Sequence, residues 1–152
     1  MTISEVLDFM NRGFKIGKLI QARLEQIKRL DALARQVTPV YGTEAVARSR
    51  RTDSRENVIV KLTDARAELE KTVDDMIRAE REIRNVISCV PDVDCRLVLE
   101  FRFLDMNTWT QITQKLDMDK SHVFRIRKKA LQMAAAVLEA ERRMKHGSGS
   151  EE

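Results

Sequence analysis

The chain has 152 residues, of which 34% are charged and only 5% are aromatic. Because it holds just five glycines and two prolines, we expect an all-α protein with long helices and a thin, aliphatic core. Its formal net charge of +4 is modest, so the placement of the charge rather than its size has to indicate a partner.

Several protein classes are disfavoured by residues that the sequence lacks. Cys89 and Cys95 form no Cys-x-x-Cys motif, and His122 and His146 are too far apart for metal-ligand spacing. No nucleophile–base pair, phosphate-binding loop or catalytic carboxylate pair is recognisable, so we expect neither an enzyme nor a cofactor. There is no signal-peptide pattern, and no apolar stretch reaches the roughly 18 residues of a membrane span. We therefore expect a cytoplasmic, nucleoid-associated protein with no membrane partner.

The first helical pattern covers residues 3 to about 36. Its apolar residues recur at steps of three and four: Ile3, Val6, Met10, Phe14, Leu19, Ile20, Leu24, Ile27, Leu30 and Leu33. Thr2 or Ser4 can cap its start. Gly13 and Gly17 weaken its middle, so a break there would leave residues 3–11 as a separate short helix. Pro39 ends the pattern, because the residue before a proline avoids the helical conformation.

Residues 38–55 contain Pro39, Gly42 and several Ser, Thr and Arg residues, and we interpret them as a mobile loop. Arg48, Arg50 and Arg51 fall within this stretch. A solvated loop is the simpler explanation of the three arginines, and an accessory contact with DNA phosphates is the alternative.

The second helical pattern covers residues 56–89. Leu62, Leu69, Met76 and Ile83 are spaced by seven, with Ala65, Val73 and Val86 between them, which is typical of helix-on-helix packing. The two patterns predict a long antiparallel helical hairpin over residues 1–89. Its narrow seam could be completed by the C-terminal helix or by a second copy of the chain, which would make a homo-oligomer. A self-sufficient monomeric hairpin is the alternative.

Residues 92–145 predict a helix-turn-helix domain with an extended last helix. Asp92 or Asp94 caps a helix over residues 96–104, in which Arg102 is expected to face solvent. Asn107 or Thr108 then caps a short helix whose inward face is Trp109, Ile112 and Leu116. Asp119 follows the turn and caps the last helix, which runs from Lys120 to about Met144. Residues 146–152 are expected to form a disordered tail.

The last helix carries the charge that indicates a partner. Between Lys120 and Leu138 there are five Lys or Arg residues and no Asp or Glu. If the helix enters the major groove, its exposed first turns can read bases, and we assign this role to Lys120, Ser121, Phe124 and Arg125. The residues expected to contact DNA phosphates are Thr108, Thr110, Gln111, His122, Arg127, Lys128 and Lys129. The simpler alternative for the basic run is a solvated amphipathic helix.

Residues 96–131 resemble region four of sigma factors and related sigma-like helix-turn-helix proteins. The matching residues are Leu97, Val98, Leu99, Phe101, Arg102 and Phe103, then Thr108 to Ile112, then Leu116, Val123, Ile126, Lys129, Ala130 and Leu131. The chain as a whole resembles phage- and prophage-encoded late transcriptional regulators of the ArpU and RinA kind. The resemblance implies a promoter-binding activator, or a factor associated with RNA polymerase.

Two departures limit this resemblance. Sigma region four usually begins its recognition helix with an Arg–Glu pair, where this chain has Lys120 and Ser121. No segment resembles sigma region two, so the chain is not expected to melt promoters. A sequence-specific DNA-binding transcriptional regulator is the leading hypothesis. A DNA-packaging protein of the small-terminase type and a polymerase-binding interaction protein are the alternatives.

Overall fold

The computed structural model describes residues 1–36 and 45–149, with only the backbone described for 45–53. The protein is all-α, as predicted, and the described residues contain no strand. The helices are α1 (Ile3–Met10), α2 (Arg12–Gln36), α3 (Ala45–Ser88), α4 (Val93–Leu99), α5 (Trp109–Leu116) and α6 (Lys120–Gly147), with a π-helical turn, η1 (Glu100–Leu104), after α4.

The helical pattern at the N-terminus is broken, and residues 3–11 are separated as the glycines suggested. Thr2 and Glu5 form a reciprocal capping box at the start of α1, in which each side chain accepts a hydrogen bond from the other residue's backbone N–H. Asn11 ends α1. Gly13 is buried, and a Cβ there would lie 3.5 Å from the Phe103 carbonyl oxygen and from Met106 Cε. A Cβ would thus be in ordinary van der Waals contact, so the space at Gly13 would also accept alanine.

The predicted loop over residues 38–55 is wrong for its second half, because α3 begins at Ala45. Both turn-forming residues of this stretch, Pro39 and Gly42, precede that helix, and residues 45–55 contain no glycine or proline to stop it. Arg48, Arg50 and Arg51 therefore lie on α3. Their side chains, and residues 38–44, are outside the described part of the chain.

The chain divides into two compact units. The first comprises Met1–Lys15 together with the chain from Ile77 onward, and the second is Ile16–Met76. This division differs from the expected one at residues 89–92, because α1 and the last turns of α3 share a hydrophobic core with the C-terminal helices. Helices at opposite ends of the sequence therefore form one folding unit, which we call the head unit. We call Ile16–Met76 the hairpin unit.

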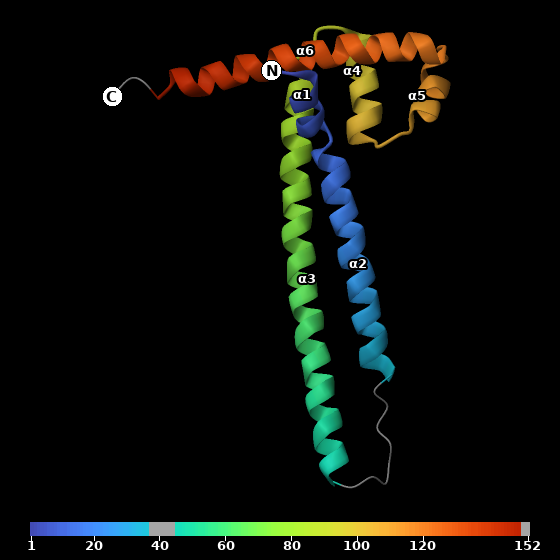
Figure 1. Cartoon of the computed structure of the whole chain (residues 1–152), viewed down its shortest axis with the longest axis vertical. Coiled ribbons are helices and arrows are strands. Elements are labelled where there is room, and N and C mark those ends of the chain that lie inside the picture. The colour runs from blue at the N-terminus through green and yellow to red at the C-terminus, as the bar shows by residue number, and fades with distance from the viewer. Residues whose placement is uncertain (37–44, 150–152) are drawn as a thin grey trace. The chain divides into compact units, whose positions relative to one another are not determined.

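The head unit is organised around α6, which contacts α1, α4 and α5 (Figure 1). The core brings together residues from each of these elements and from the end of α3: Val6, Met10, Ile83, Val86, Ile87, Val90, Cys95, Val98, Leu99, Phe103, Ile112, Val123, Ile126, Ala130, Leu131, Ala134 and Leu138. All of these side chains are 8% exposed or less. The π-helical turn makes Phe103 the buried aromatic of its segment, while Phe101 and Leu104 are half-buried.

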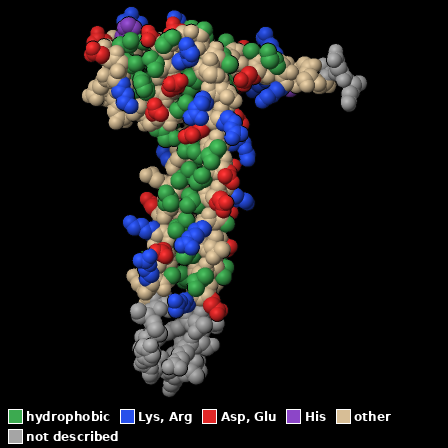
Figure 2. All heavy atoms as spheres, turned by 180° about the vertical axis from the view of Figure 1, so that it is seen from behind, with side chains coloured by type: hydrophobic (Ala, Val, Ile, Leu, Met, Phe, Trp, Pro, Cys, Tyr) green, Lys and Arg blue, Asp and Glu red, His purple; other side chains and the backbone are tan. Residues whose placement is uncertain are grey.

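In the hairpin unit, α2 and α3 run antiparallel (Figure 1). On α3 the inward row is Val58, Leu62, Ala65, Leu69, Thr72 and Met76, which confirms the predicted seven-residue repeat. Val73 was predicted for this row but is exposed. The residue three positions after Leu69 is Thr72, and it is Thr72 that takes the buried position. The row on α2 is Ile16, Ile20, Arg23, Ile27, Leu30 and Ala34, all half-buried. Hydrophobic side chains are visible along this unit in Figure 2.

The last helix continues to Gly147, three residues beyond its predicted end. His146 and Gly147, assigned to a disordered tail, are therefore helical, and residues 150–152 lie outside the described part. No helix among the described residues combines the length and apolarity needed to cross a membrane.

Candidate nucleic-acid interface

The interface begins at α5, whose start is fixed by a second capping box. Thr108 Oγ1 accepts a hydrogen bond from the Gln111 backbone N–H at 3.2 Å, and Gln111 Oε1 accepts one from the Thr108 N–H at 2.9 Å. Ile112 is fully buried on the inward face, while Trp109 and Leu116 are half-buried. Thr110 and Gln111 remain exposed. The three polar residues predicted to contact phosphates thus lie together at one helix end.

A three-residue turn connects α5 to α6. Asp117 ends α5 in the left-handed conformation, with φ 51° and ψ 47°, which short polar side chains tolerate better than most. The Met118 N–H then donates to the Thr113 carbonyl at 3.2 Å. Asp119 occupies the N-cap position of α6, as predicted, but its side chain makes no capping hydrogen bond there. The turn is closed by backbone hydrogen bonds.

The first three turns of α6 have two distinct faces. Val123, Ile126, Ala130 and Leu131 are buried, as the spacing predicted. The opposite face exposes Lys120, Ser121, His122, Phe124, Arg125, Lys128 and Lys129. This acid-free face contains all four residues predicted to read bases, and it lies on the helix packed against α5. We call it the basic face.

Phe124 differs from the other residues of the basic face because its ring packs against another aromatic ring. Its ring lies against Trp109, with centroids 5.6 Å apart and planes tilted by 36°, and it is 39% exposed. Lys120 Nζ lies 5.9 Å from the centre of the Phe124 ring. The aromatic pair thereby ties the start of α6 to the start of α5. The outer part of the Phe124 ring remains accessible to a partner.

Arg127 does not belong to the basic face. It is half-buried, with its guanidinium carbon 5.3 Å from the centre of the Trp109 ring. Arg102 lies 5.1 Å from the same ring, so two guanidinium groups share one tryptophan. Arg127 is thus better described as a residue that holds α5 against α6 than as the phosphate contact expected from sequence.

Arg102 was predicted to face solvent, and that prediction is wrong. Its guanidinium lies over the rings of both Trp109 and Phe14, and Nη1 donates to the Asn107 carbonyl at 2.9 Å. Burial, followed by the charge of Arg127, lowers the pKa of Arg102. Sequence reasoning missed this cluster because cation–π partners on four different segments have no fixed spacing. The lone Trp109 was the available signal.

Lys129 is exposed but is engaged by an acid. Its Nζ lies 3.3 Å from Asp92 Oδ2, while Asp92 Oδ1 accepts a hydrogen bond from the Cys95 backbone N–H at 3.0 Å. That backbone hydrogen bond and Lys129 hold the pKa of Asp92 below its ordinary value. The Asp92 cap predicted from sequence is therefore present. Part of the Lys129 charge is already neutralised within the protein.

A hollow of about 270 Å³ lies beside the basic face. It is lined by Asp92, Asp94, Cys95, His122, Arg125, Ile126 and Lys129. The Cys95 thiol is buried, and desolvation raises its pKa to about 11. Cys89 is a free, exposed thiol. Within the described chain, no group of His, Cys, Asp and Glu side chains is arranged to hold a metal ion.

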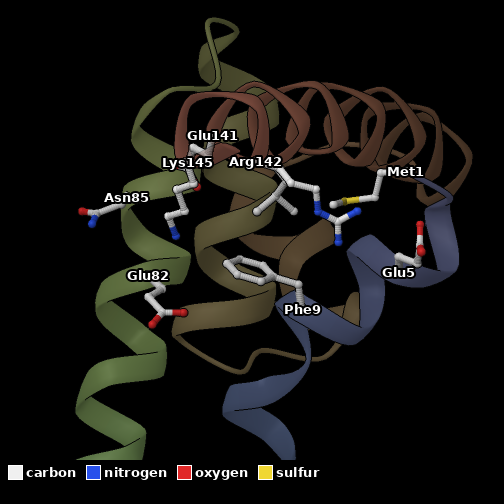
Figure 3. A pocket seen from close by; sticks show the side chains of 9 residues that line it. Met1, Glu5, Phe9, Glu82, Asn85, Glu141, Arg142 and Lys145 are labelled. Atoms are coloured by element: carbon white, nitrogen blue, oxygen red, sulfur yellow. The ribbon is translucent and has the colours of Figure 1, made fainter. Parts of the chain in front are cut away.

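A larger hollow of about 520 Å³ lies elsewhere in the head unit, between α1, the end of α3 and α6 (Figure 3). Phe9 and Leu138 provide its apolar lining. Its charged residues are of both signs: Glu5, Glu82, Glu141, Arg142 and Lys145. Glu82 is paired with Arg12 at 2.7 Å, and Glu5 is used by the α1 capping box. This mixture lacks the single sign of charge expected of a phosphate-binding surface.

Comparison with known proteins identifies a family without indicating an activity. Residues 36–135 match the family described as "Protein of unknown function (DUF1492)", and the chain belongs to that family. No curated protein matches the chain. No solved structure matches it.

Proposed function

We propose that this protein binds double-stranded DNA through the basic face of α6 and acts as a sequence-specific transcriptional regulator. The observation that carries the proposal is the two-faced start of α6. One side is buried against α4 and α5, and the other is the basic face, whose own residues include no acid and which meets Asp92 only at Lys129. A helix-turn-helix needs a helix presented in this way to enter the major groove.

The residues at the start of the basic face have side chains suited to base edges. Lys120 and Arg125 can donate hydrogen bonds to guanine O6 and N7, and Ser121 can pair with several bases. The exposed part of Phe124 can contact a thymine methyl group. Backbone contacts come from Lys128, from His122 and from the polar start of α5, where Thr108, Thr110 and Gln111 gather. In this arrangement Arg127 holds α6 against α5. Lys129 contributes less to phosphate binding than its charge suggests, because Asp92 neutralises part of that charge.

We further propose that α4 to α6 form a module like region four of sigma factors. The order α4, η1, α5, turn and α6 is compatible with a module like sigma region four, and the residues that carry this resemblance occupy these elements. A phage or prophage promoter-binding activator that works with RNA polymerase is the corresponding hypothesis.

Binding to DNA can be measured by fluorescence anisotropy with a labelled random-sequence duplex over a range of salt concentrations. We expect salt-sensitive binding, with log K falling by about 0.9 per phosphate neutralised for each tenfold rise in salt. The double variant Lys120→Ala with Arg125→Ala should weaken binding at least tenfold. A matched control, Arg143→Ala with Lys145→Ala, removes two exposed basic residues from the far end of the same helix and should change binding by less than threefold.

Sequence specificity can be tested by selecting bound fragments from a library of random duplexes. Enrichment of one motif by the wild type, and loss of that motif in the Lys120 and Arg125 variant, is the expected result. Failure to bind any duplex at low salt would overturn the proposal. Retention on RNA polymerase without DNA binding would instead favour a protein-docking role for the same module.

A further inference from the structure

The basic face of α6 has two flanks, and a different helix packs at each. On one flank, Phe124 and Arg127 contact the ring of Trp109 on α5. On the other flank, the start of α4 lies against α6, where the Cys95 thiol donates a weak hydrogen bond to the Ile126 carbonyl at 3.9 Å. The hollow of about 270 Å³ lies on this second flank. A group that enters the hollow therefore meets side chains from both α4 and α6.

The two walls of this hollow differ in their hydrogen-bonding chemistry. The α6 wall consists of His122, Arg125 and Lys129, which share one side of the helix because they are spaced by three and four residues. The α4 wall carries the carboxylates of Asp92 and Asp94. A wall rich in donors thus faces groups that, when ionised, can only accept hydrogen bonds. The edge of a base pair in the major groove presents the matching mixture of acceptors and donors.

The two carboxylates of the α4 wall differ in their availability. Asp92 caps α4 by accepting a hydrogen bond from the Cys95 N–H, and it also pairs with Lys129. Asp94 is exposed, and among the described residues no hydrogen bond or ion pair engages its side chain. Arg125 on the opposite wall is exposed and is equally unpaired within the described chain. The Asp94 carboxylate and the Arg125 guanidinium can therefore both bind a molecule that lies over the hollow.

We propose that Asp94 is a specificity-determining residue, which accepts a hydrogen bond from the N4 amino group of a cytosine in the base pair adjacent to the one that Arg125 reads. The inference rests on the proposed DNA-binding function. In the major groove, cytosine presents a donor at N4, whereas guanine presents acceptors at N7 and O6 and thymine presents one at O4. An ionised carboxylate attracts the cytosine donor and repels the acceptors of the other two bases. Helix α4 thereby adds a base-reading position to those of α6.

Selection of bound fragments from a library of random duplexes, carried out with the full chain, tests each position of the motif. Arg125→Ala should lose the preference for one guanine, and Asp94→Ala should lose the preference for a cytosine in an adjacent base pair. Asp94→Asn should replace that cytosine preference with one for adenine, because an amide can bond both N6 and N7 of adenine. Asp105→Asn neutralises an exposed acid that follows η1, and this matched control should keep the whole motif.

Anisotropy titrations with the selected duplex measure the size of the effect. Replacing the cytosine by thymine should weaken wild-type binding about tenfold or more, and should change binding of Asp94→Ala by less than about threefold. If Asp94→Ala proves unfolded by circular dichroism, Asp94→Asn, which keeps the shape of the side chain, decides.

The outcomes separate this inference from the proposed function. If Asp94→Ala selects the wild-type motif while the Lys120 and Arg125 variant loses it, the inference is wrong and the proposed function stands. An equal gain of affinity by Asp94→Ala for every duplex would also overturn the inference, because the carboxylate would then act only by repelling phosphates. Failure of the wild type to bind any duplex would overturn both.

Discussion

The head unit and the hairpin unit are both helical, yet they bury their apolar residues to very different extents. In the head unit, α6 is covered by α1, α4 and α5, and residues such as Leu131 and Ala134 are 1% exposed or less. In the hairpin unit, the inward row of α2 is half-buried along its whole length. An apolar repeat thus specifies helices in both units. The apolar side chains are removed from water only in the head unit, where several helices pack around them.

This difference predicts unequal costs for the same substitution. Leu131→Ala in the head unit should lower the free energy of unfolding by about 3 kcal/mol, because it leaves a cavity in a closed core. Leu30→Ala in the hairpin unit should cost about 1 kcal/mol, since its side chain is only partly removed from water. Urea unfolding followed by circular dichroism measures both. Equal costs would contradict the unequal burial of the two units.

A second prediction separates packing from recognition within the head unit. Arg127→Ala should destabilise the fold by about 1 kcal/mol, because it removes a guanidinium packed on Trp109. Lys128→Ala, one residue further on, should leave stability unchanged within 0.5 kcal/mol, as exposed substitutions usually do, while reducing the salt dependence of DNA binding by about one phosphate. Thermal unfolding and anisotropy titrations measure the two effects. If both variants change stability equally and change DNA binding equally, the separation of packing from recognition is wrong.

The smallest expected effect concerns the ion pair between Asp92 and Lys129. Asp92 has a folded-state pKa below its ordinary value of 3.8, so its contribution to stability is present above that pH. It should disappear as the pH falls through the lowered pKa. Asp92→Asn retains a capping side chain and removes the charge opposite Lys129. Its stability deficit should therefore be present at pH 6 and vanish in strong acid. Asp31→Asn, in the surface pair of α2, is the control and should show a smaller deficit at pH 6.

Much of the fold followed from local sequence features. The break before Gly13, the capping positions of Thr2, Asp92 and Thr108, and the seven-residue repeat of α3 each depend on residues close together in the chain. The start of α3 was misplaced because Ser, Thr and Arg residues were interpreted as a loop. Those residues do not stop a helix, and the turn-forming Pro39 and Gly42 lie before Ala45.

The candidate interface was predictable where it depends on helical spacing and not where it depends on contacts between segments. The exposure of Lys120, Ser121 and Arg125 follows from the burial of Val123 and Ile126 on the same helix. Arg102 was assigned to solvent and Arg127 to a phosphate contact, although both pack on Trp109. The charge of an arginine does not indicate that another helix supplies an aromatic ring for it. The pairing of Lys129 with Asp92 was hidden for the same reason.

The sequence by itself determined that the chain is helical, where most helices begin, and which side of α6 is basic. Helix spacing, capping and charge placement are properties of neighbouring residues, so they can be recognised without knowing the fold. The tertiary structure decided that α1 and the end of α3 pack with the C-terminal helices. It also decided that Arg102 and Arg127 share Trp109, and that α2 leaves its apolar row half-buried. These are properties of residues far apart in the chain, whose meeting depends on how all the helices pack together.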